Sequence, residues 1–278
     1  EIPEGDNNFK GRAIQNMLNI EPDDSVNAML RLRGLNDEEF VNSHYVVFAT
    51  KNGTIKKTCL EAYSRPRTNG VNAINIVDGD EVVDVRLTNG KNEIILANRN
   101  GRAVRFDENT VRSMGRVSTG VRGMQLDGDD DQVVGMIIVN NAETETVMVV
   151  SENGYGKRSQ VEDYRKTNRG GKGVKTFSIT EKTGRLVAIK NVTDDNDLMI
   201  INKSGIAIRL AVSDCRVMGR ATQGVRLINL SKKNDVIASV CKVMSSELEA
   251  KLADDNAEQE TEATDTPNTA ENDSENEK

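Results

Sequence analysis

Basic side chains recur in this sequence at the same places of a repeating pattern, and phosphate binding is the chemistry they suit. One group lies in polar connections between apolar runs: Lys10, Arg12, Arg65, Arg67, Arg112, Arg116, Arg165, Lys166, Arg169, Lys172, Arg216 and Arg220. A second group ends or follows short apolar runs: Lys56, Lys57, Arg105, Arg122, Lys157, Arg158, Lys175, Arg209 and Arg226. If equivalent positions lie on one rim, these charges form a continuous band that fits a phosphate backbone.

Two of the basic connections are nearly identical. Arg112-Ser113-Met114-Gly115-Arg116 and Arg216-Val217-Met218-Gly219-Arg220 lie 104 residues apart. Glycine allows close approach of the backbone, and the flanking arginines can hold adjacent phosphates. The alternative is that lysine and arginine only keep strand edges soluble. This solubility explanation is adequate for single residues, but it does not explain why a basic residue recurs at the same position of every repeat.

A third connection is rich in glycine and ends in Arg169, Gly170, Gly171, Lys172 and Gly173. It resembles a nucleotide-binding P-loop only superficially. Lys172 is followed by glycine rather than Ser or Thr, and the flanking segments have the pattern of strands rather than of a strand and a helix. We therefore group all five residues with the candidate phosphate-binding positions.

Residues that could carry out catalysis are scarce. His44 is the only histidine, and it stands between polar residues before an apolar run. Cys59, Cys215 and Cys241 are far apart, without the spacing of a metal or redox motif. The sequence therefore predicts neither a catalytic site nor a metal site. The odd number and wide separation of the cysteines favour a reducing, cytoplasmic compartment.

The elements that must position the bases come from an internal repeat. Its first element is a turn followed by a short strand, with glycines at Gly53, Gly101, Gly154 and Gly205, which are 48, 53 and 51 residues apart. Its second element is a glycine leading into another strand: Gly70–Ile74, Gly120–Met124, Gly173–Phe177 and Gly224–Ile228. Four short strands in about 50 residues are typical of a propeller blade.

A closing element, an acidic turn followed by an apolar run, ends each unit. It occurs five times, because the segment 19–26 resembles 75–82. The sequence therefore predicts an all-β ring of propeller-like, four-stranded blades over residues 1–243, with five blades represented and the first incomplete. Since the chain starts at Glu1 inside a repeat, we expect it to be a fragment of a longer protein.

Composition supports this division of the chain. Of 278 residues, 36% are hydrophobic and 3% aromatic, so the core must consist mainly of aliphatic residues. No apolar stretch approaches the roughly 20 residues that span a bilayer, and we expect no membrane contact. Residues 244–278 hold 12 acidic and two basic residues. This second region is predicted to be a largely disordered acidic tail.

These motifs together resemble the C-terminal β-pinwheel domain of the A subunit of DNA gyrase, a type IIA topoisomerase. The resemblance rests on 52–58, 77–81, 120–123, 153–158 and 219–225, and it extends over residues 1–243. It implies that the domain wraps duplex DNA around its basic rim and supports ATP-dependent negative supercoiling. It also implies the partners of that enzyme: a homodimer of the whole A subunit, and the B subunit in an A2B2 complex.

Two departures from the family pattern limit what carries over. The hallmark box Gln-Arg-Arg-Gly-Gly-Lys-Gly belongs to the family's first blade, whereas its nearest match here, Thr167–Gly173, keeps the last five of seven positions in a later blade. The strand-cleaving tyrosine belongs to the N-terminal part of the family's longer chain, and none of Tyr45, Tyr63, Tyr155 or Tyr164 has its surroundings. The resemblance therefore assigns this chain no cofactor, while the whole enzyme uses ATP and Mg²⁺.

Two other functions remain open from sequence alone. The equivalent domain of topoisomerase IV has the same fold, although the acidic tail and the glycine-rich basic connection favour gyrase. A propeller can also serve as a protein-interaction module, which a repeat-wide basic rim disfavours. Because aromatic residues are few, duplex DNA is favoured over single strands, whose bases stack on aromatic rings.

Overall fold

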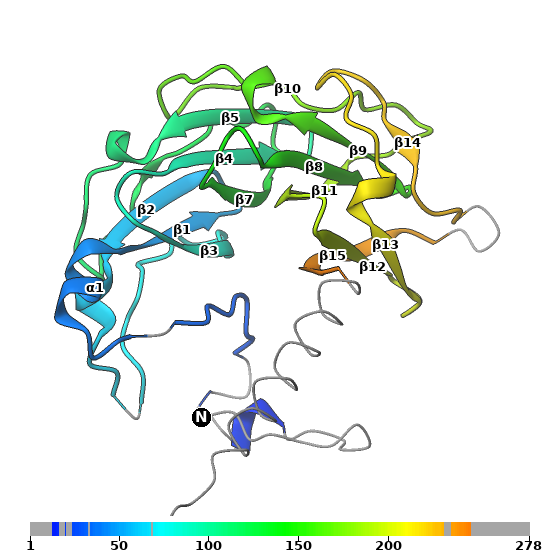
Figure 1. Ribbon diagram of the computed structural model, residues 1–278. Coiled ribbons are helices and arrows are strands. Elements are labelled where there is room, and N and C mark those ends of the chain that lie inside the picture. The colour runs from blue at the N-terminus through cyan, green and yellow to red at the C-terminus, as the bar shows by residue number, and fades with distance from the viewer. Residues whose placement is uncertain are drawn as a thin grey trace, which may run out of the picture.

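A computed structural model describes residues 13–16, 20, 24–32, 34–67, 69–230 and 235–245. Within them, four antiparallel β-sheets follow one another along the chain and lie side by side in an arc (Figure 1). The predicted all-β, propeller-like class is confirmed. Helical structure in the described part of the chain is limited to α1 (Glu38–Ser43) and five 3-10 helices: η1 (Ile14–Asn16), η2 (Leu60–Tyr63), η3 (Glu108–Thr110), η4 (Val161–Asp163) and η5 (Val212–Asp214).

The first three sheets have four strands in the same spatial order. The first is β3 (Val82–Thr88), β1 (Tyr45–Thr50), β2 (Thr54–Cys59) and β6 (Val121–Arg122). The second is β7 (Val133–Val139), β4 (Glu93–Asn98), β5 (Arg102–Asp107) and β10 (Val174–Lys175). The third is β11 (Leu186–Val192), β8 (Thr146–Ser151), β9 (Tyr155–Gln160) and β14 (Val225–Arg226).

The fourth sheet has three strands within the described residues: β15 (Ile237–Met244), β12 (Asn196–Asn202) and β13 (Ala207–Ala211). In the first three sheets a tight turn joins the two middle strands, and in the fourth the equivalent turn joins β12 to β13. At the first of these turns Gly53 has a φ of 84°, and a Cβ there would lie 2.6 Å from the carbonyl oxygen of Met124. Glycine is therefore needed both for the turn and for the close approach of the next unit.

The short fourth strand of each of the first three sheets comes from the following repeat unit. Val121 of β6 lies opposite Ile55 of β2, although Val121 belongs to the unit that forms the second sheet. The same exchange joins β10 to β5 and β14 to β9. The sequence predicted four strands per unit but not this exchange, which ties each blade to the next through backbone hydrogen bonds.

Two expectations for the N-terminal region are wrong. The second-element segment Gly70–Ile74 forms no strand. Residues 24–32, which hold part of the supposed incomplete first blade, also form no strand, so the described residues contain four blades rather than five. Leu30, Leu32 and Leu35 instead pack against the first sheet. Residues 246–278, and with them the predicted tail, lie outside the described residues.

The hydrophobic core lies between neighbouring sheets. One cluster joins Ile55 of β2 to Leu96 of β4 and Phe106 of β5, all fully buried. Equivalent clusters join the second sheet to the third and the third to the fourth. Face-to-face packing of this kind fixes the spacing of the blades, and therefore the spacing of their outer edges. No described helix is long and apolar enough to span a membrane.

Candidate nucleic-acid interface

The outermost strand of each of the first three sheets ends in an exposed basic residue. These residues are Arg122 on β6, Lys175 on β10 and Arg226 on β14. β10 and β14 lie on the outer side of the arc (Figure 1), and β6 has the equivalent edge position in the first sheet. Each base also occupies the same register, opposite the first residue of the second strand of its sheet. Strand exchange therefore repeats one positive charge along the outer edge of the blades.

The connections before these edge strands add a second row of exposed arginines. Arg112, Arg165 and Arg216 each follow a 3-10 helix and lie eight residues before the glycine that opens the edge strand. Each connection is fixed to the preceding sheet by an equivalent bond: Met114 N to Lys57 O (2.8 Å), Thr167 N to Arg105 O (2.8 Å) and Met218 N to Arg158 O (2.9 Å). The connections therefore lie in the same position on each blade.

We call the exposed bases of these edge strands and connections the outer rim: Arg112, Arg122, Arg165, Lys166, Lys172, Lys175, Arg216 and Arg226. Lys166 contacts Glu93 at 2.5 Å and Lys172 contacts Asp127 at 2.7 Å, with about half of each lysine side chain still exposed. Hydrogen bonding to Lys172 lowers the pKa of Asp127 below its ordinary value. The Lys172–Asp127 pair is exposed on both sides and contributes little to stability, whereas the Glu93 side chain is 18% exposed and also binds Arg105.

Other predicted bases lie outside this rim. Arg65 and Arg67 are exposed on the connection of the first unit, where they line a cleft with Arg116. Arg209 on β13 bonds Asp197 at 2.6 Å and the Met244 carbonyl at 2.7 Å. Lys10 and Arg12 lie outside the described residues.

The bases that end the second strands are not rim residues, which corrects the sequence prediction. Lys57 and Arg158 are buried, and the Arg105 side chain is 11% exposed. Each points to the next unit's 3-10 turn: Lys57 to Glu108 (3.0 Å), Arg105 to the Val161 and Tyr164 carbonyls (2.8 and 3.1 Å), and Arg158 to the Val212 and Cys215 carbonyls (3.0 and 3.3 Å). These cations fasten one blade to the next.

Lys56 and Lys157, one residue earlier in their strands, are buried as well. The Lys56 ammonium donates to the carbonyls of Ala73 at 2.5 Å and Arg116 at 2.7 Å. Lys157 donates to the Gly219 carbonyl at 2.7 Å. Burial lowers the pKa of Lys56 to about 8 and that of Lys157 to about 7. Both lysines therefore support a connection from beneath and are not accessible to DNA.

The second sheet has Val104 where its neighbours have these lysines, and the connection above it is the glycine-rich one. A cleft of about 230 Å³ lies between β5 and this connection, lined by Arg165, Gly171, Lys172, Gly173 and residues beside them. Gly170 continues the contact with the preceding blade through a bond to the Gly123 carbonyl (2.7 Å). The glycine-rich connection therefore lies over this cleft, whereas the equivalent connections on the first and third sheets lie over a buried lysine.

Arg169 and Arg220 are also inter-blade contacts. Arg169 donates to the Arg122 carbonyl at 2.9 Å and Arg220 to the Lys175 carbonyl at 2.6 Å, so each reaches the preceding edge strand. Both remain partly exposed. They hold in position the strands that carry the rim bases. Arg116, at the equivalent place in the first of these connections, lines the cleft with Arg65 and Arg67.

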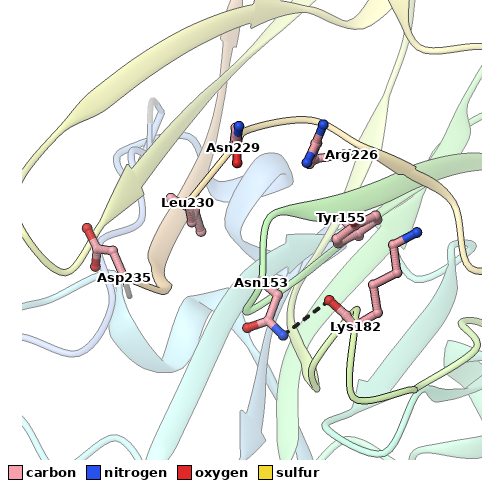
Figure 2. Close-up of a pocket in the computed structure, with 7 residues that line it drawn as sticks. All are labelled: Asn153, Tyr155, Lys182, Arg226, Asn229, Leu230 and Asp235. Atoms are coloured by element: carbon pink, nitrogen blue, oxygen red, sulfur yellow. Dashed lines mark hydrogen bonds between the residues drawn. The ribbon is translucent and has the colours of Figure 1, made fainter. Parts of the chain in front are cut away.

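A further cleft opens beside the last edge strand, and sequence reasoning did not identify it. It measures about 260 Å³, and Figure 2 shows Tyr155, Lys182 and Arg226 around it. The Lys182 ammonium lies 5.5 Å from the centroid of the Tyr155 ring. Asn153 donates to the Lys182 carbonyl at 3.2 Å. A half-buried tyrosine between two cations extends the basic surface around Arg226.

Groups that could act as nucleophiles or proton carriers have structural partners. Burial raises the pKa of Tyr164 to about 12, and its hydroxyl bonds Thr176 at 2.5 Å. The His44 ring lies against Phe40, with centroids 4.1 Å apart, and its Nδ1 is 2.9 Å from the Phe40 carbonyl. Cys59, Cys215 and Cys241, all within the described residues, form no disulfide bond. Among the described residues, no three His, Cys, Asp or Glu side chains are grouped to hold a metal ion.

Comparison with known proteins matches the four blades one by one. The family described as DNA gyrase C-terminal domain, beta-propeller, matches residues 44–89, 92–140, 145–193 and 196–241. These ranges cover most of the chain. The chain belongs to this family.

Relatives and solved structures agree with membership of the gyrase C-terminal domain family. The DNA gyrase A subunit from Staphylococcus aureus (strain MRSA252) is 40% identical over 269 residues, 95% of this chain. Its counterpart from Staphylococcus aureus (strain NCTC 8325 / PS 47) is 42% identical over 243 residues, 87% of the chain. The chain spans 30% and 27% of those proteins.

Two solved structures resemble the fold of this gyrase-family chain. The C-terminal domain of DNA topoisomerase IV has a TM-score of 0.78 at 27% identity, covering 90% of this chain and 75% of that one. The DNA gyrase A C-terminal domain has a TM-score of 0.74 at 24% identity, covering 85% and 76%. The second likeness is one of fold alone.

The family's hallmark box has its nearest match, Thr167–Gly173, on the connection over the second sheet. The last residue of this match, Gly173, packs directly against the backbone of β5, since a Cβ there would collide with the Ala103 carbonyl oxygen. Arg169 and Lys172 of the match divide their roles, since Arg169 holds the Arg122 carbonyl while Lys172 is exposed on the rim. In this gyrase-family chain the motif therefore combines blade packing with exposed charge.

Proposed function

We propose that the chain binds duplex DNA along the outer rim and wraps it around the arc of blades. The observation that carries the proposal is the row Arg122, Lys175 and Arg226, at one register on three successive outer edges. A duplex that follows this row bends around the arc, and its phosphate backbone contacts each blade in turn. Binding then depends on phosphate contacts and only weakly on base sequence.

The fastened connections support wrapping rather than simple attachment. Bending a duplex costs free energy, of order 1–6 kcal/mol for 40–90°. A protein surface can offset this bending free energy only if its basic residues keep their positions when the bent DNA is bound. Here the row is held by inter-blade cores, by the buried cations Lys57 and Arg158 and by the mostly buried Arg105.

In the whole protein we infer that this wrapping serves a type IIA topoisomerase, with this chain as the C-terminal part of the DNA gyrase A subunit. The remainder of that longer chain, forming a homodimer, and the gyrase B subunit in an A2B2 complex would supply strand cleavage and ATP-dependent strand passage in the cytoplasm. The part played by this domain would be to set the handedness of the DNA crossing. The 40–42% identity to gyrase A subunits supports this assignment.

The equivalent role in topoisomerase IV is the second candidate, because a solved topoisomerase IV domain has a TM-score of 0.78 with this chain. The two functions differ in their demand on DNA. Gyrase-type supercoiling needs the duplex to wrap, whereas binding a crossing for topoisomerase IV does not.

A topology assay separates these functions. Nicked circular DNA is ligated in the presence of the chain, deproteinised and resolved by gel electrophoresis. We expect a shift in linking number that grows with protein concentration. Duplex binding without any shift would support the topoisomerase IV role, and no duplex binding at all would favour a protein-interaction module.

A variant with Arg122, Lys175 and Arg226 replaced by Ala tests the rim itself. The shift should be strongly reduced, because three charges at the outer edge are lost. A matched control replaces Arg31, Lys91 and Lys203, which are also exposed but lie away from the edge strands. If both triple variants lose the shift equally, the rim is not the wrapping surface.

A further inference from the structure

The cleft beside β14 differs from the same place on the two preceding sheets. In each of the first three sheets the base of the edge strand lies opposite the first residue of the second strand. That residue is Thr54 in the first sheet, Arg102 in the second and Tyr155 in the third. Of these three sheets, the third is the one that places an aromatic ring beside an outer edge strand.

The charges around this place differ as well. In the second sheet the Arg102 guanidinium lies 3.8 Å from the Asp127 carboxylate, which also binds the Lys172 ammonium at 2.7 Å. Opposite charges within the protein therefore balance one another there. A site of this kind has little attraction left for an external anion.

In the third sheet the turn before β11 presents a lysine instead. Asn153 fixes this turn by donating to the Lys182 carbonyl at 3.2 Å. The Lys182 ammonium lies 5.5 Å from the centroid of the Tyr155 ring, near the roughly 6 Å limit of a cation–π contact. Arg226 lines the same cleft and is exposed. Two cations therefore stand beside one half-buried ring.

The remaining wall of the cleft is apolar and polar in turn. Figure 2 shows Asn229 and Leu230 between the cationic end and Asp235, which lies at the other end. The Asp235 carboxylate accepts from the Ser204 hydroxyl at 2.6 Å and the Val236 amide at 2.8 Å, so it is held by the fourth sheet. The cleft volume of about 260 Å³ is just below the roughly 300 Å³ at which sites for drug-sized ligands begin. This volume fits one nucleotide unit.

We propose that this cleft binds a single deoxynucleotide whose base is unpaired. The base stacks on Tyr155 in place of the Lys182 ammonium, and the phosphate lies between Lys182 and Arg226. Stacking on an aromatic side chain is available to any base, because every base has an aromatic face. A paired base is already stacked in its duplex and cannot enter. The ligand is therefore a free mononucleotide or an extrahelical nucleotide of bound DNA, and the second source rests on the proposed function, since Arg226 is also a rim residue.

Binding of thymidine 5′-monophosphate tests the cleft without DNA. Isothermal titration calorimetry of the full chain at low salt compares this nucleotide with inorganic phosphate. We expect a Kd of about 0.1 to 1 mM for the nucleotide. Inorganic phosphate should bind about 5- to 100-fold more weakly, because it lacks the stacked base. Equal affinity for the two ligands would overturn the proposal, since the ring would then contribute nothing.

Variants at Tyr155 and Lys182 separate stacking from charge. Tyr155→Phe keeps the ring and should bind the nucleotide like the unaltered chain. Tyr155→Thr, which introduces the residue type of the first sheet, should bind the nucleotide no more tightly than phosphate. Lys182→Gln should weaken binding of both ligands, and Lys91→Gln, at an exposed lysine elsewhere, is its matched control. Thermal unfolding identifies the folded variants. Unchanged nucleotide binding by folded Tyr155→Thr or by Lys182→Gln would overturn the proposal.

Two duplexes distinguish the sources of the nucleotide. One is fully paired, and the other carries a single extrahelical thymidine. A few-fold preference for the second duplex that is lost in Tyr155→Thr would assign the site to DNA, whereas nucleotide binding without this preference would assign it to the free mononucleotide. Failure of the mononucleotide to bind while the linking-number shift persists would overturn the site and leave the proposed function intact. Mononucleotide binding without a linking-number shift would do the reverse.

Discussion

Two sets of bases recur with the same period in this chain and have opposite roles. Lys57, Arg105 and Arg158 end the second strands and are withdrawn beneath the next unit. Arg122, Lys175 and Arg226 stand on the outer edge strands with their side chains exposed. The difference is topological: a connection crosses over the first set, while no described backbone lies outside the second. Periodic charge can therefore serve blade assembly as well as ligand binding.

The same comparison explains why the withdrawn set tolerates burial. The Arg158 guanidinium has the Val212 and Cys215 carbonyls and the Asp194 carboxylate (2.7 Å) as partners. A buried charge with complete hydrogen bonding is tolerated, whereas removing it leaves its buried partners unsatisfied. Among the described residues, the exposed side chains of Arg122, Lys175 and Arg226 have no buried partner that their removal would leave unsatisfied. Substitutions in the buried set should therefore lower stability, and substitutions in the rim set should lower DNA affinity.

The largest effect is expected for Arg158→Ala. Breaking a buried charged network costs about 3–5 kcal/mol, so urea unfolding should show a loss in this range. DNA affinity, measured at low temperature where the variant stays folded, should change less than about twofold, or 0.4 kcal/mol. Arg226→Ala is the matched control, with a stability change within about 0.5 kcal/mol. A stable Arg158→Ala variant that has lost DNA affinity would reverse the two roles.

The next effect concerns binding. Replacing Arg122, Lys175 and Arg226 together should lower duplex affinity at low salt by about 10- to 100-fold, with unfolding almost unchanged. The slope of log affinity against log salt should fall by about 2.7, since each phosphate contact contributes about 0.9. Filter binding at several salt concentrations measures both. An unchanged slope would mean that these side chains do not contact phosphate.

The repeat, the propeller-like blade architecture and the basic connections could be predicted because they leave regular signals in the sequence. Glycine spacing located the turns, and the second-element pattern located β6, β10 and β14 correctly as strands. The sequence could not predict which sheet each would join. Exchange onto the preceding sheet depends on the angle between blades, which is set by packing of residues such as Ile55 and Phe106.

Exposure of the bases was predicted less well. Arg105 and Arg158 find most of their partners among backbone carbonyls, and a carbonyl has no residue type to signal it in a sequence. The acidic partners of the withdrawn bases, Glu108 for Lys57, Glu93 for Arg105 and Asp194 for Arg158, lie 12 to 51 residues away in the sequence, so no local spacing marks the pairs. The strand expected at Gly70–Ile74 was also wrong, because such a two-residue strand forms only where a neighbouring sheet pairs with it.

A smaller effect, on the pH dependence of stability, is expected from the buried Lys157 of the third sheet, whose place in the second sheet is taken by Val104. The pKa of Lys157 is about 7 in the fold, against 10.5 for the ordinary side chain. Between these values the unfolded chain binds more protons, so the Lys157 contribution to stability rises with pH and its burial cost is largest below about pH 7. The slope is at most about 1.4 kcal/mol per pH unit for one proton.

Comparison of two variants measures this contribution. The stability of the unaltered chain relative to Lys157→Met should increase between about pH 7 and pH 9 in urea unfolding. Val104→Met, at the equivalent place in the second sheet, provides a control whose relative stability should not change with pH through this site. A relative stability of Lys157→Met that is flat with pH would mean that the lysine keeps an ordinary pKa.

The smallest effect concerns the acidic C-terminal residues, which we expect to compete with DNA for the outer rim. Residues 254–278 hold ten acidic side chains and one basic one, joined to the same chain as the rim. A short flexible linkage gives an effective concentration in the millimolar range. Deleting these residues should therefore raise duplex affinity by a few-fold at low ionic strength, where screening is weakest.

Salt dependence decides whether the acidic residues act on the rim or only keep the protein soluble. A competitor held by charge loses its hold as the Debye length falls below about 10 Å, so the gain from deletion should disappear at higher salt. In the variant lacking Arg122, Lys175 and Arg226 the gain should also be smaller, since part of the shared surface is gone. Equal affinities of the two chain lengths at low salt would rule out competition, and a gain independent of the rim variant would place the acidic residues elsewhere on the molecule.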